Sequence, residues 1–282
     1  MKTKLLFLVI VTLFLSGARV VAQDPDFHIY LCFGQSNMEG AARIEPQDTT
    51  VDGRFMVMET IDCPNLGRVK GGWYPAIPPL TRCRTGLSPA DYFGRTMVEN
   101  LPKNIRVGVI NVSIGGCKIQ LFDKETYKEY VSTAPRWMVP MINSYDGDPY
   151  GRLVEMAKLA QQDGVIKGIL MHQGESDNGD TTWPGKVRKV YENLLNDLGL
   201  QPEKVPFLAG EMFSAAEGGI CTDMNAIIAT LPQVIPNSWV ISSEGCPGMP
   251  DHLHFTPEGY RILGRRYAAR MLSLMGYNIN MP

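Results

Sequence analysis

Continuous apolar runs alternate with amphipathic segments along most of the chain. Strand-like apolar runs lie at 28–34, 55–59, 105–113, 165–172, 205–212 and 239–243, and helical patterns lie at 88–100, 151–162, 184–197 and 257–275. The runs do not alternate between polar and apolar residues, which favours a sheet covered on both faces. Strand–helix alternation therefore predicts an α/β fold, a three-layer α/β/α sandwich around a doubly wound, mainly parallel sheet.

The last helical pattern has both of its ends marked in the sequence. Thr256 can cap the start, Pro257 suits the first turn, and Gly276 can stop the helix. Between these ends runs an apolar stripe with a spacing of three to four residues: Tyr260, Leu263, Tyr267, Met271 and Leu274. We expect this stripe to pack on the sheet.

Polar residues follow the apolar runs at the points where the predicted strands end. The stretch HIYLCFGQSNMEG at 28–40 passes from a buried strand into Gly-Gln-Ser-Asn, the run at 105–113 leads into Ser-Ile-Gly-Gly, and the run at 165–172 leads into His-Gln-Gly-Glu-Ser-Asp. Ligands bind at the carboxyl ends of the strands in open parallel sheets. The sequence therefore predicts a functional site at this edge.

The first residues have the pattern of a secretory signal peptide. Lys2 and Lys4 precede an apolar run at 5–15, and 20–22 offers small residues for cleavage after Ala22. The run is interrupted at 16–19, too early for a membrane span, and no later segment is apolar enough to cross a bilayer. We expect a leader at 1–22, one domain at 23–282, export to the periplasm or the outside, and no stable membrane association after cleavage.

Removal of this leader makes the chain more acidic. Without Lys2, Lys4 and Arg19, the chain has 24 basic and 29 acidic residues, a net charge of −5. Because no basic patch or run occurs, nucleic acid and anionic membranes are not expected partners.

Six cysteines in an exported chain are candidates for disulfides. Cys63 and Cys83 flank a loop rich in Gly and Pro, and a later pair, Cys221 and Cys246, is also suited to local pairing. Cys32 in the first strand and Cys117 are equally compatible with buried free thiols. No CxxC spacing is present, so a zinc cluster is not predicted.

Few histidines are available to act as a base. They are His28, His172, His252 and His254, and His28 begins a strand at the wrong end of the sheet. A serine hydrolase needs a base on its hydroxyl and a carboxylate on the other ring nitrogen of that base. Asp251 and His254, three residues apart in DHLHF, could supply both to a serine at a strand end.

The segments GQSNM, NVSIGG, HQGES and DHLHF occur in the order of the sequence blocks of the SGNH (GDSL-like) hydrolase superfamily. Within it the chain resembles the acetylxylan esterase and sialate O-acetylesterase-like branch of carbohydrate esterases, carbohydrate esterase family six. The resemblance runs from residue 34 to residue 255 and implies a flavodoxin-like α/β/α fold.

The resemblance also implies roles for individual residues. Ser36 matches the nucleophile and His254 the general base, while Asp251 matches the acid that orients the histidine. The oxyanion hole would comprise the N–H groups of Ser36 and Gly116 and the side-chain amide of Gln173, which stands where the superfamily usually has asparagine. Glu175 resembles a carboxylate sometimes assigned as the partner of the histidine, so Asp251 and Glu175 both remain candidates for the triad acid.

These observations predict an exported serine esterase that needs no cofactor and removes O-acetyl groups from carbohydrate. Acetylated xylan is the first expected substrate, and O-acetylated sialic acid is the alternative. Trp73 and Trp183 are candidates to bind the sugar. Ser113 is expected to be structural, because NVSIG lacks the first glycine of a Gly-x-Ser-x-Gly elbow. We expect His172 to position other groups and His252 to lie in a loop.

Two other classes of protein would use different residues. A metal-dependent deacetylase could recruit His172, Glu175, Asp251 and His252, although no HExxH pairing is present. A non-catalytic carbohydrate-binding module could stack sugars on Trp73, Trp137 and Trp183. Such a module has no need of Ser36 and His254 together.

Overall fold

The computed structural model describes residues 23–277, so the predicted signal peptide at 1–22 lies outside the described residues. Its middle layer is a seven-stranded sheet with the order β3-β2-β4-β1-β5-β6-β7. The neighbouring strands are parallel except for β3, which is antiparallel to β2. The strands are β1 Asp24–Gly34, β2 Phe55–Met58, β3 Trp73–Pro75, β4 Arg106–Ser113, β5 Gly164–His172, β6 Phe207–Gly210 and β7 Ser238–Ile241.

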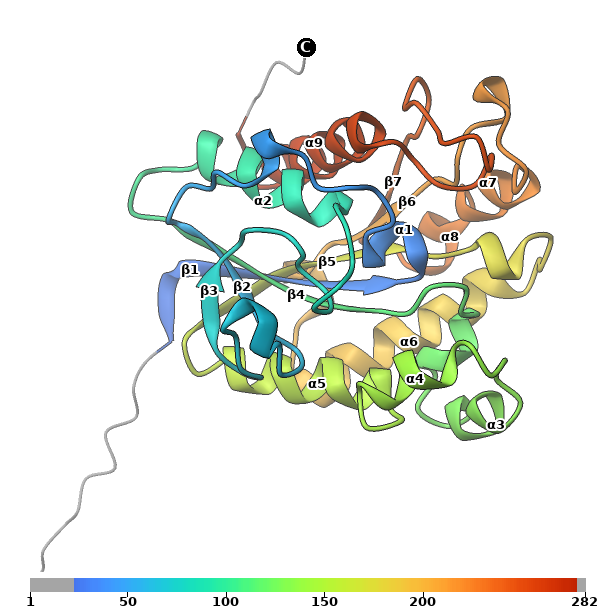
Figure 1. The fold of residues 1–282 in the computed structure, drawn as a ribbon, viewed down its shortest axis with the longest axis horizontal. Coiled ribbons are helices and arrows are strands. Elements are labelled where there is room, and N and C mark those ends of the chain that lie inside the picture. The colour runs from blue at the N-terminus through green and yellow to red at the C-terminus, as the bar shows by residue number, and fades with distance from the viewer. Residues whose placement is uncertain (1–22, 278–282) are drawn as a thin grey trace, which may run out of the picture.

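Helices cover both faces of this sheet. Figure 1 shows α2 and α9 on one face and α5 and α6 on the other. The helices are α1 Ser36–Glu39, α2 Pro89–Asn100, α3 Tyr127–Ser132, α4 Val139–Asn143, α5 Pro149–Ala160, α6 Trp183–Leu198, α7 Asp223–Ile228, α8 Leu231–Val234 and α9 Pro257–Leu274. The predicted α/β class with a mainly parallel sheet is therefore confirmed, and each predicted strand and helix is present near its expected position.

The central strand explains why its sequence reads as an unbroken apolar run. β1 pairs with β4 on one side and with β5 on the other. Ile29, Leu31 and Phe33 belong to the core under α5 and α6, whereas Tyr30 and Cys32 belong to the core under α2 and α9. Alternate residues of a strand point to opposite faces of the sheet. Because helices cover both faces, all five side chains are fully buried.

The ends of α9 follow the sequence prediction. Thr256 Oγ1 accepts a hydrogen bond from the amide of Gly259 at 3.2 Å, Pro257 is the first helical residue, and Gly276 has a φ of +85° just beyond the end. The apolar stripe is buried as far as Met271, but Leu274 is 36% exposed. The prediction was therefore wrong for Leu274, because Leu272 and not Leu274 continues the buried face in the last turn.

The cysteines correct one part of the sequence analysis. Cys63 and Cys83 form a disulfide, and Cys32 and Cys117 are buried free thiols. The local pairing suggested for Cys221 and Cys246 is wrong, because both thiols are free. The first contacts the carbonyl oxygen of Glu175 at 3.7 Å and the second contacts Arg266 Nη1 at 3.5 Å, so each sulfur packs on a different part of the structure.

None of the helices within residues 23–277 is both long enough and apolar enough to cross a bilayer.

The order of the central strands is the feature of the fold that most affects the site. The chain passes from β4 to β5 across β1, so the carboxyl ends of these three strands lie side by side. A crevice at such a crossover is where ligands bind in open α/β sheets.

Candidate active site

Ser36 lies at the carboxyl end of β1, where the chain turns directly into the short helix α1. Gly34 makes this turn possible: its φ is +153°, and a Cβ there would lie 2.1 Å from the carbonyl oxygen of His172 on β5. The close approach of β1 to β5 therefore excludes a side chain at this position. The adjacent amide of Gln35 donates to the same His172 carbonyl at 3.0 Å and fixes the start of the turn.

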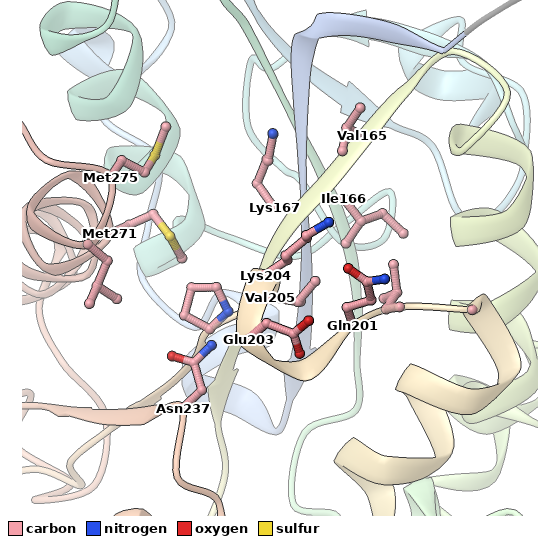
Figure 2. Close-up of a pocket in the computed structure, with 14 residues that line it drawn as sticks. Val165, Ile166, Lys167, Gln201, Glu203, Lys204, Val205, Asn237, Met271 and Met275 are labelled. Carbon is pink, nitrogen blue, oxygen red and sulfur yellow. The ribbon is translucent and has the colours of Figure 1, made fainter.

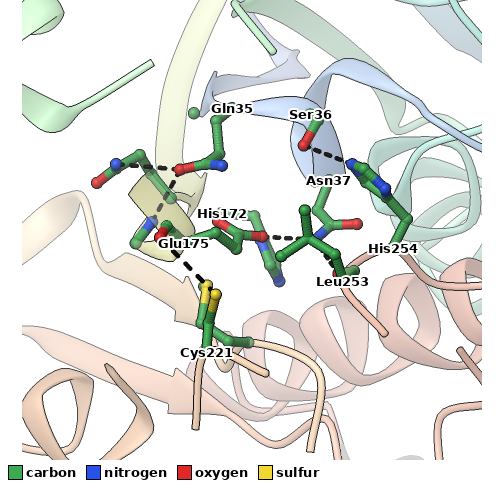
Figure 3. Close-up of polar contacts among 12 residues, drawn as sticks. Gln35, Ser36, Asn37, His172, Glu175, Cys221, Leu253 and His254 are labelled. Atoms are coloured by element: carbon green, nitrogen blue, oxygen red, sulfur yellow. Dashed lines mark hydrogen bonds and ion pairs between the residues drawn. The ribbon is translucent and has the colours of Figure 1, made fainter. Parts of the chain in front are cut away.

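The loop before α9 carries the base and its carboxylate to this serine. His254 Nε2 lies 2.8 Å from Ser36 Oγ, as Figure 3 shows, and His254 Nδ1 lies 2.7 Å from Asp251 Oδ2. The other oxygen of Asp251 accepts the backbone N–H groups of Leu253 and His254, both at 3.0 Å. The turn 251–254 is therefore held by the same carboxylate that orients the imidazole ring.

The charge of Asp251 determines which nitrogen of His254 carries the proton. Burial opposes the ionised form of Asp251, but the hydrogen bonds from His254 and Leu253 outweigh it, and the pKa of the carboxyl group is lowered. An ionised carboxylate only accepts hydrogen bonds, so the His254 Nδ1–H must donate to it. The Nε2 lone pair is then free to accept the proton of Ser36, as a serine hydrolase requires.

Glu175 does not contact His254. Its Oε1 accepts a hydrogen bond from Asn37 Nδ2 at 2.5 Å and lies 3.6 Å from His172 Nδ1. Asn37 Nδ2 also donates to the carbonyl of Leu253 at 3.1 Å, which ties this buried carboxylate to the loop that carries the base. Of the two candidates for the triad acid, Asp251 is thus the one that holds the ring, and Glu175 acts through Asn37.

His172 occupies the interior below this network. Burial lowers the pKa of its ring, so the ring is neutral near pH 7. Its Nε2 lies 2.9 Å from the carbonyl of Glu211, and a carbonyl only accepts, so this nitrogen carries the proton. The positioning role suggested for His172 agrees with these contacts. Ser113 is also buried, and its hydroxyl donates to Asn111 Oδ1 at 2.8 Å, which fits the structural role predicted for it.

Two backbone N–H groups beside Ser36 are suited to an oxyanion hole. Within residues 23–277 the amides of Ser36 and Gly116 have no hydrogen-bond partner, and Gly116 has a φ of +71°. A Cβ on Gly115 would lie 3.7 Å from the Cβ of Ser36, so this turn adjoins the serine. Two contacts hold the turn: the Gly115 amide donates to Glu39 at 3.0 Å, and Ser176 Oγ donates to the Gly116 carbonyl at 2.9 Å.

The side-chain amide predicted for the oxyanion hole is not placed to serve there. Gln173 is fully buried, its Oε1 accepts the indole N–H of Trp183 at 2.6 Å, and its Nε2 donates to Asp177 at 2.6 Å. The same nitrogen lies 3.2 Å from both Gln35 Oε1 and the carbonyl of Cys117. With both N–H bonds directed at protein acceptors, Gln173 has none left for substrate.

Gln35, which the sequence analysis did not single out, is a second side-chain amide beside Ser36 and a candidate for this role. Three donors converge on its Oε1: Gln173 Nε2 at 3.2 Å, the Gly174 amide at 3.4 Å and the Ser176 amide at 3.2 Å. Within residues 23–277 its Nε2 has no partner, and Figure 3 shows that this nitrogen points to the side of Ser36. Its place directly before the predicted nucleophile was the signal that could have identified it.

This assignment predicts the effect of replacing Gln35 with glutamate. The substitution keeps an oxygen for the three donors and removes the N–H groups that face Ser36, so we expect kcat to fall about 10²- to 10³-fold with little change in KM. Steady-state kinetics on a soluble acetyl ester, with thermal unfolding to check the fold, measures this. A kcat within about threefold of wild type, under roughly 1 kcal/mol of barrier, would remove Gln35 from the oxyanion hole.

Comparison with known proteins identifies the family. Residues 26–273 match the family described as carbohydrate esterase, sialic acid-specific acetylesterase (SASA). The chain belongs to this family. It is therefore an SGNH-type carbohydrate acetylesterase. The order of its sequence blocks had predicted the SGNH superfamily.

Solved structures with the same fold accompany this match. A protein from Arabidopsis thaliana is 22% identical, has a TM-score of 0.68 and covers 89% of this chain and 99% of its own. The structure of NanS is 17% identical with a TM-score of 0.64, covering 89% and 98%. A carbohydrate acetylesterase from Xanthomonas citri is 17% identical with a TM-score of 0.62, covering 89% of this chain and 57% of its own. At these identities the likeness establishes the fold of the esterase.

The two tryptophans predicted to bind sugar lie elsewhere in the esterase, and that prediction was wrong. Trp73 donates its indole N–H to Asp163 at 2.9 Å and packs on Phe27 with ring centroids 4.8 Å apart, near the amino ends of the central strands. Trp183 is fully buried and donates to Gln173. Bulky aromatic side chains fill cores more often than they line sites: Trp183 lies in the core and Trp73 packs against it.

The residues of the metal alternative are divided between different contacts. Asp251 faces His254, and Glu175 faces Asn37 and His172, while His252 lies exposed in the loop with a φ of +59°. Within residues 23–277 no group of three or more His, Cys, Asp or Glu side chains is arranged to hold a metal ion.

A cavity of about 660 Å³ opens at the opposite edge of the sheet. Figure 2 shows that its walls come from the start of β5, the residues before β6 and β7, and the last turns of α9, including Lys167, Lys204, Asn237 and Met271. Neither Ser36 nor His254 lines it, so this cavity is separate from the candidate site at the carboxyl ends of the strands.

Proposed function

We propose that this esterase hydrolyses O-acetyl esters of carbohydrate through an acetyl-enzyme on Ser36. The observation that carries the proposal is the hydrogen-bonded series from Ser36 Oγ through His254 to Asp251, beside two unpartnered N–H groups. His254 Nε2 removes the hydroxyl proton as Oγ attacks the acetyl carbonyl. The negative charge that develops on the carbonyl oxygen is stabilised by the amides of Ser36 and Gly116 and by Gln35 Nε2.

The same histidine completes both halves of the reaction. The imidazolium formed in the attack is stabilised by Asp251 and protonates the leaving sugar oxygen as the ester C–O bond breaks. His254 then removes a proton from water, which attacks the acetyl-enzyme and releases acetate, and the proton returns to Ser36 Oγ. No cofactor takes part in this sequence of proton transfers.

Two carbohydrates are proposed as substrates. Acetylated xylan is the first, because the sequence blocks resemble those of acetylxylan esterases. O-acetylated sialic acid is the second, and its support is the description of the matched family, which names sialic acid. Two exposed cations near the oxyanion turn, Lys118 and Arg136, have no ion-pair partner within residues 23–277 and could attract the carboxylate of a sialic acid.

Export of the enzyme is also a proposal. The signal-like pattern at 1–22 predicts it, and the disulfide between Cys63 and Cys83 supports it, since structural disulfides persist mainly in oxidising compartments. A polymeric substrate such as xylan would meet the enzyme outside the cell.

Release of acetate from the two carbohydrates tests the function. Purified enzyme, exhaustively dialysed against EDTA, is incubated with acetylated xylan and separately with O-acetylated sialic acid, and free acetate is measured by mass spectrometry. We expect full activity to survive the chelator, because the proposed proton transfers use protein groups alone. Activity lost on dialysis and restored only by zinc would support the metal-dependent reaction, and acetate from sialic acid alone would reverse the order of the substrates.

A further inference from the structure

Trp137 is the tryptophan that borders the candidate active site. Its side chain is 60% exposed, whereas Trp183 is fully buried. It lies two residues before α4, on the segment that passes over the turn containing Gly116. Large exposed aromatic side chains beside functional sites commonly contact the ligand.

The contact between Trp137 and Gly116 is made by the edge of the ring. A Cβ on Gly116 would lie 2.5 Å from Cη2 of the tryptophan, 3.4 Å from Cζ2 and 3.5 Å from Cζ3. These three atoms form the outer edge of the six-membered ring, so the flat faces of the indole are not covered by this turn. Within residues 23–277 the amide of Gly116 is one of the unpartnered N–H groups, and Gly115 adjoins Ser36, so the ring lies beside the site.

A second set of contacts fixes the tryptophan against the oxyanion turn. The adjacent Met138 is buried, and its sulfur lies 3.8 Å from the hydroxyl of Tyr130. That hydroxyl accepts the backbone N–H of Lys118 at 3.1 Å, two residues beyond Gly116. The segment with Trp137 is thus anchored to the turn, while within residues 23–277 no aromatic ring or cation stacks on the indole.

From this geometry we propose that Trp137 is a stacking platform for a pyranose ring of the substrate, at the subsite next to the acetyl group. The C–H face of a pyranose is apolar and can remove the exposed face of the indole from water. A preordered ring loses little conformational freedom on binding, since its backbone is already tied to the turn. The inference rests on the proposed function, because it identifies how that same site recognises a sugar.

The platform is tested by comparing an ester that carries a sugar with one that does not. We expect Trp137→Ala to lower kcat/KM for acetylated xylo-oligosaccharides about 10- to 30-fold, mainly through KM, the range for truncating an aromatic anchor at an interface. Hydrolysis of ethyl acetate, which has no ring to stack, should change less than about threefold. Trp137→Tyr, which retains a flat ring, should recover most of the loss.

Matched variants separate this role from a structural one. Trp239→Ala removes a partly buried tryptophan under Arg270, on the β7 side of the sheet, and should leave the ratio of the two activities unchanged. An equal loss on both esters with Trp137→Ala would mean that the ring only supports Gly116, and no loss on either would also overturn the platform. If wild-type enzyme cleaves ethyl acetate but no acetylated carbohydrate, including O-acetylated sialic acid, the proposed function fails instead.

Discussion

Ser36→Ala will lower kcat at least about 10³-fold and as much as about 10⁶-fold while leaving the fold intact. The alanine removes the atom that attacks the acetyl carbonyl, and neither His254 nor Asp251 can replace it as a nucleophile without rebuilding the site. The fold should persist because Ser36 Oγ makes one side-chain contact, with His254 Nε2. Single-turnover release of acetate from a soluble ester measures the loss, and circular dichroism with thermal unfolding measures the fold.

Covalent labelling gives an independent check of this assignment. A fluorophosphonate reacts with an activated serine, so mass spectrometry should locate the label on Ser36 of the wild-type enzyme and find none on Ser36→Ala. Ser113 is the relevant comparison, because it lies in the adjacent sequence block but is buried and bonded to Asn111. A label on Ser113, or activity within tenfold of wild type in Ser36→Ala (about 1.4 kcal/mol), would end the assignment of the nucleophile.

Asp251→Asn will lower kcat by about 10⁴-fold, the second-largest effect expected. An amide facing His254 Nδ1 can present an N–H group, which favours the tautomer with the proton on Nε2. That nitrogen could then no longer accept the proton of Ser36, and the imidazolium would lose its 2.7 Å carboxylate partner. The measurement is kcat/KM on a soluble acetyl ester across pH, with folding checked by circular dichroism.

Glu175→Gln is the matched control for Asp251→Asn. The substitution also exchanges a carboxylate for an amide, but the remaining oxygen can still accept the hydrogen bond from Asn37, and His254 is not touched. We expect kcat within about tenfold of wild type, or about 1.4 kcal/mol of barrier, with an unchanged pH profile, as befits a positioning residue. If Glu175→Gln abolishes activity while Asp251→Asn stays near wild type, Glu175 is the triad acid and the geometric ranking is wrong.

The fold was largely predictable because its signals are local. The buried run at 28–34 could be recognised as a strand from its own residues. Thr256 and Pro257 mark the start of α9, and Gly276 marks its end. What escaped was β3, three residues of an antiparallel edge strand, because so short a segment in a loop rich in Gly and Pro has no recognisable period. The helices α1, α3, α4, α7 and α8, of four to six residues, escaped for the same reason.

The placement of the candidate catalytic residues was predictable for a similar reason. Asp251 and His254 lie three residues apart, so one turn was enough to bring the carboxylate to the ring, and Ser36 follows a strand whose end had to lie at the ligand-binding edge. The predicted acid–base pair needed only the sequence spacing, and the nucleophile needed only the order of strand and turn.

The amide groups around Ser36 could be assigned only in three dimensions. Gln35 and Gln173 are chemically identical, and their difference arises because Trp183 and Asp177 occupy the amide of one while the amide nitrogen of the other is left free. The same holds for the aromatic residues: Trp183 is buried although polar residues precede it, and Trp137 is exposed although apolar residues follow it. Sequence alone thus determined the strands, the capped helix and the pairing of Asp251 with His254, because these depend on neighbours along the chain. Only the tertiary structure decided which amide, carboxylate and indole lie beside Ser36. Glu175 contacts Asn37 and Gln173 contacts Gln35 from 138 residues away along the chain, and burial is set by packing between such distant segments.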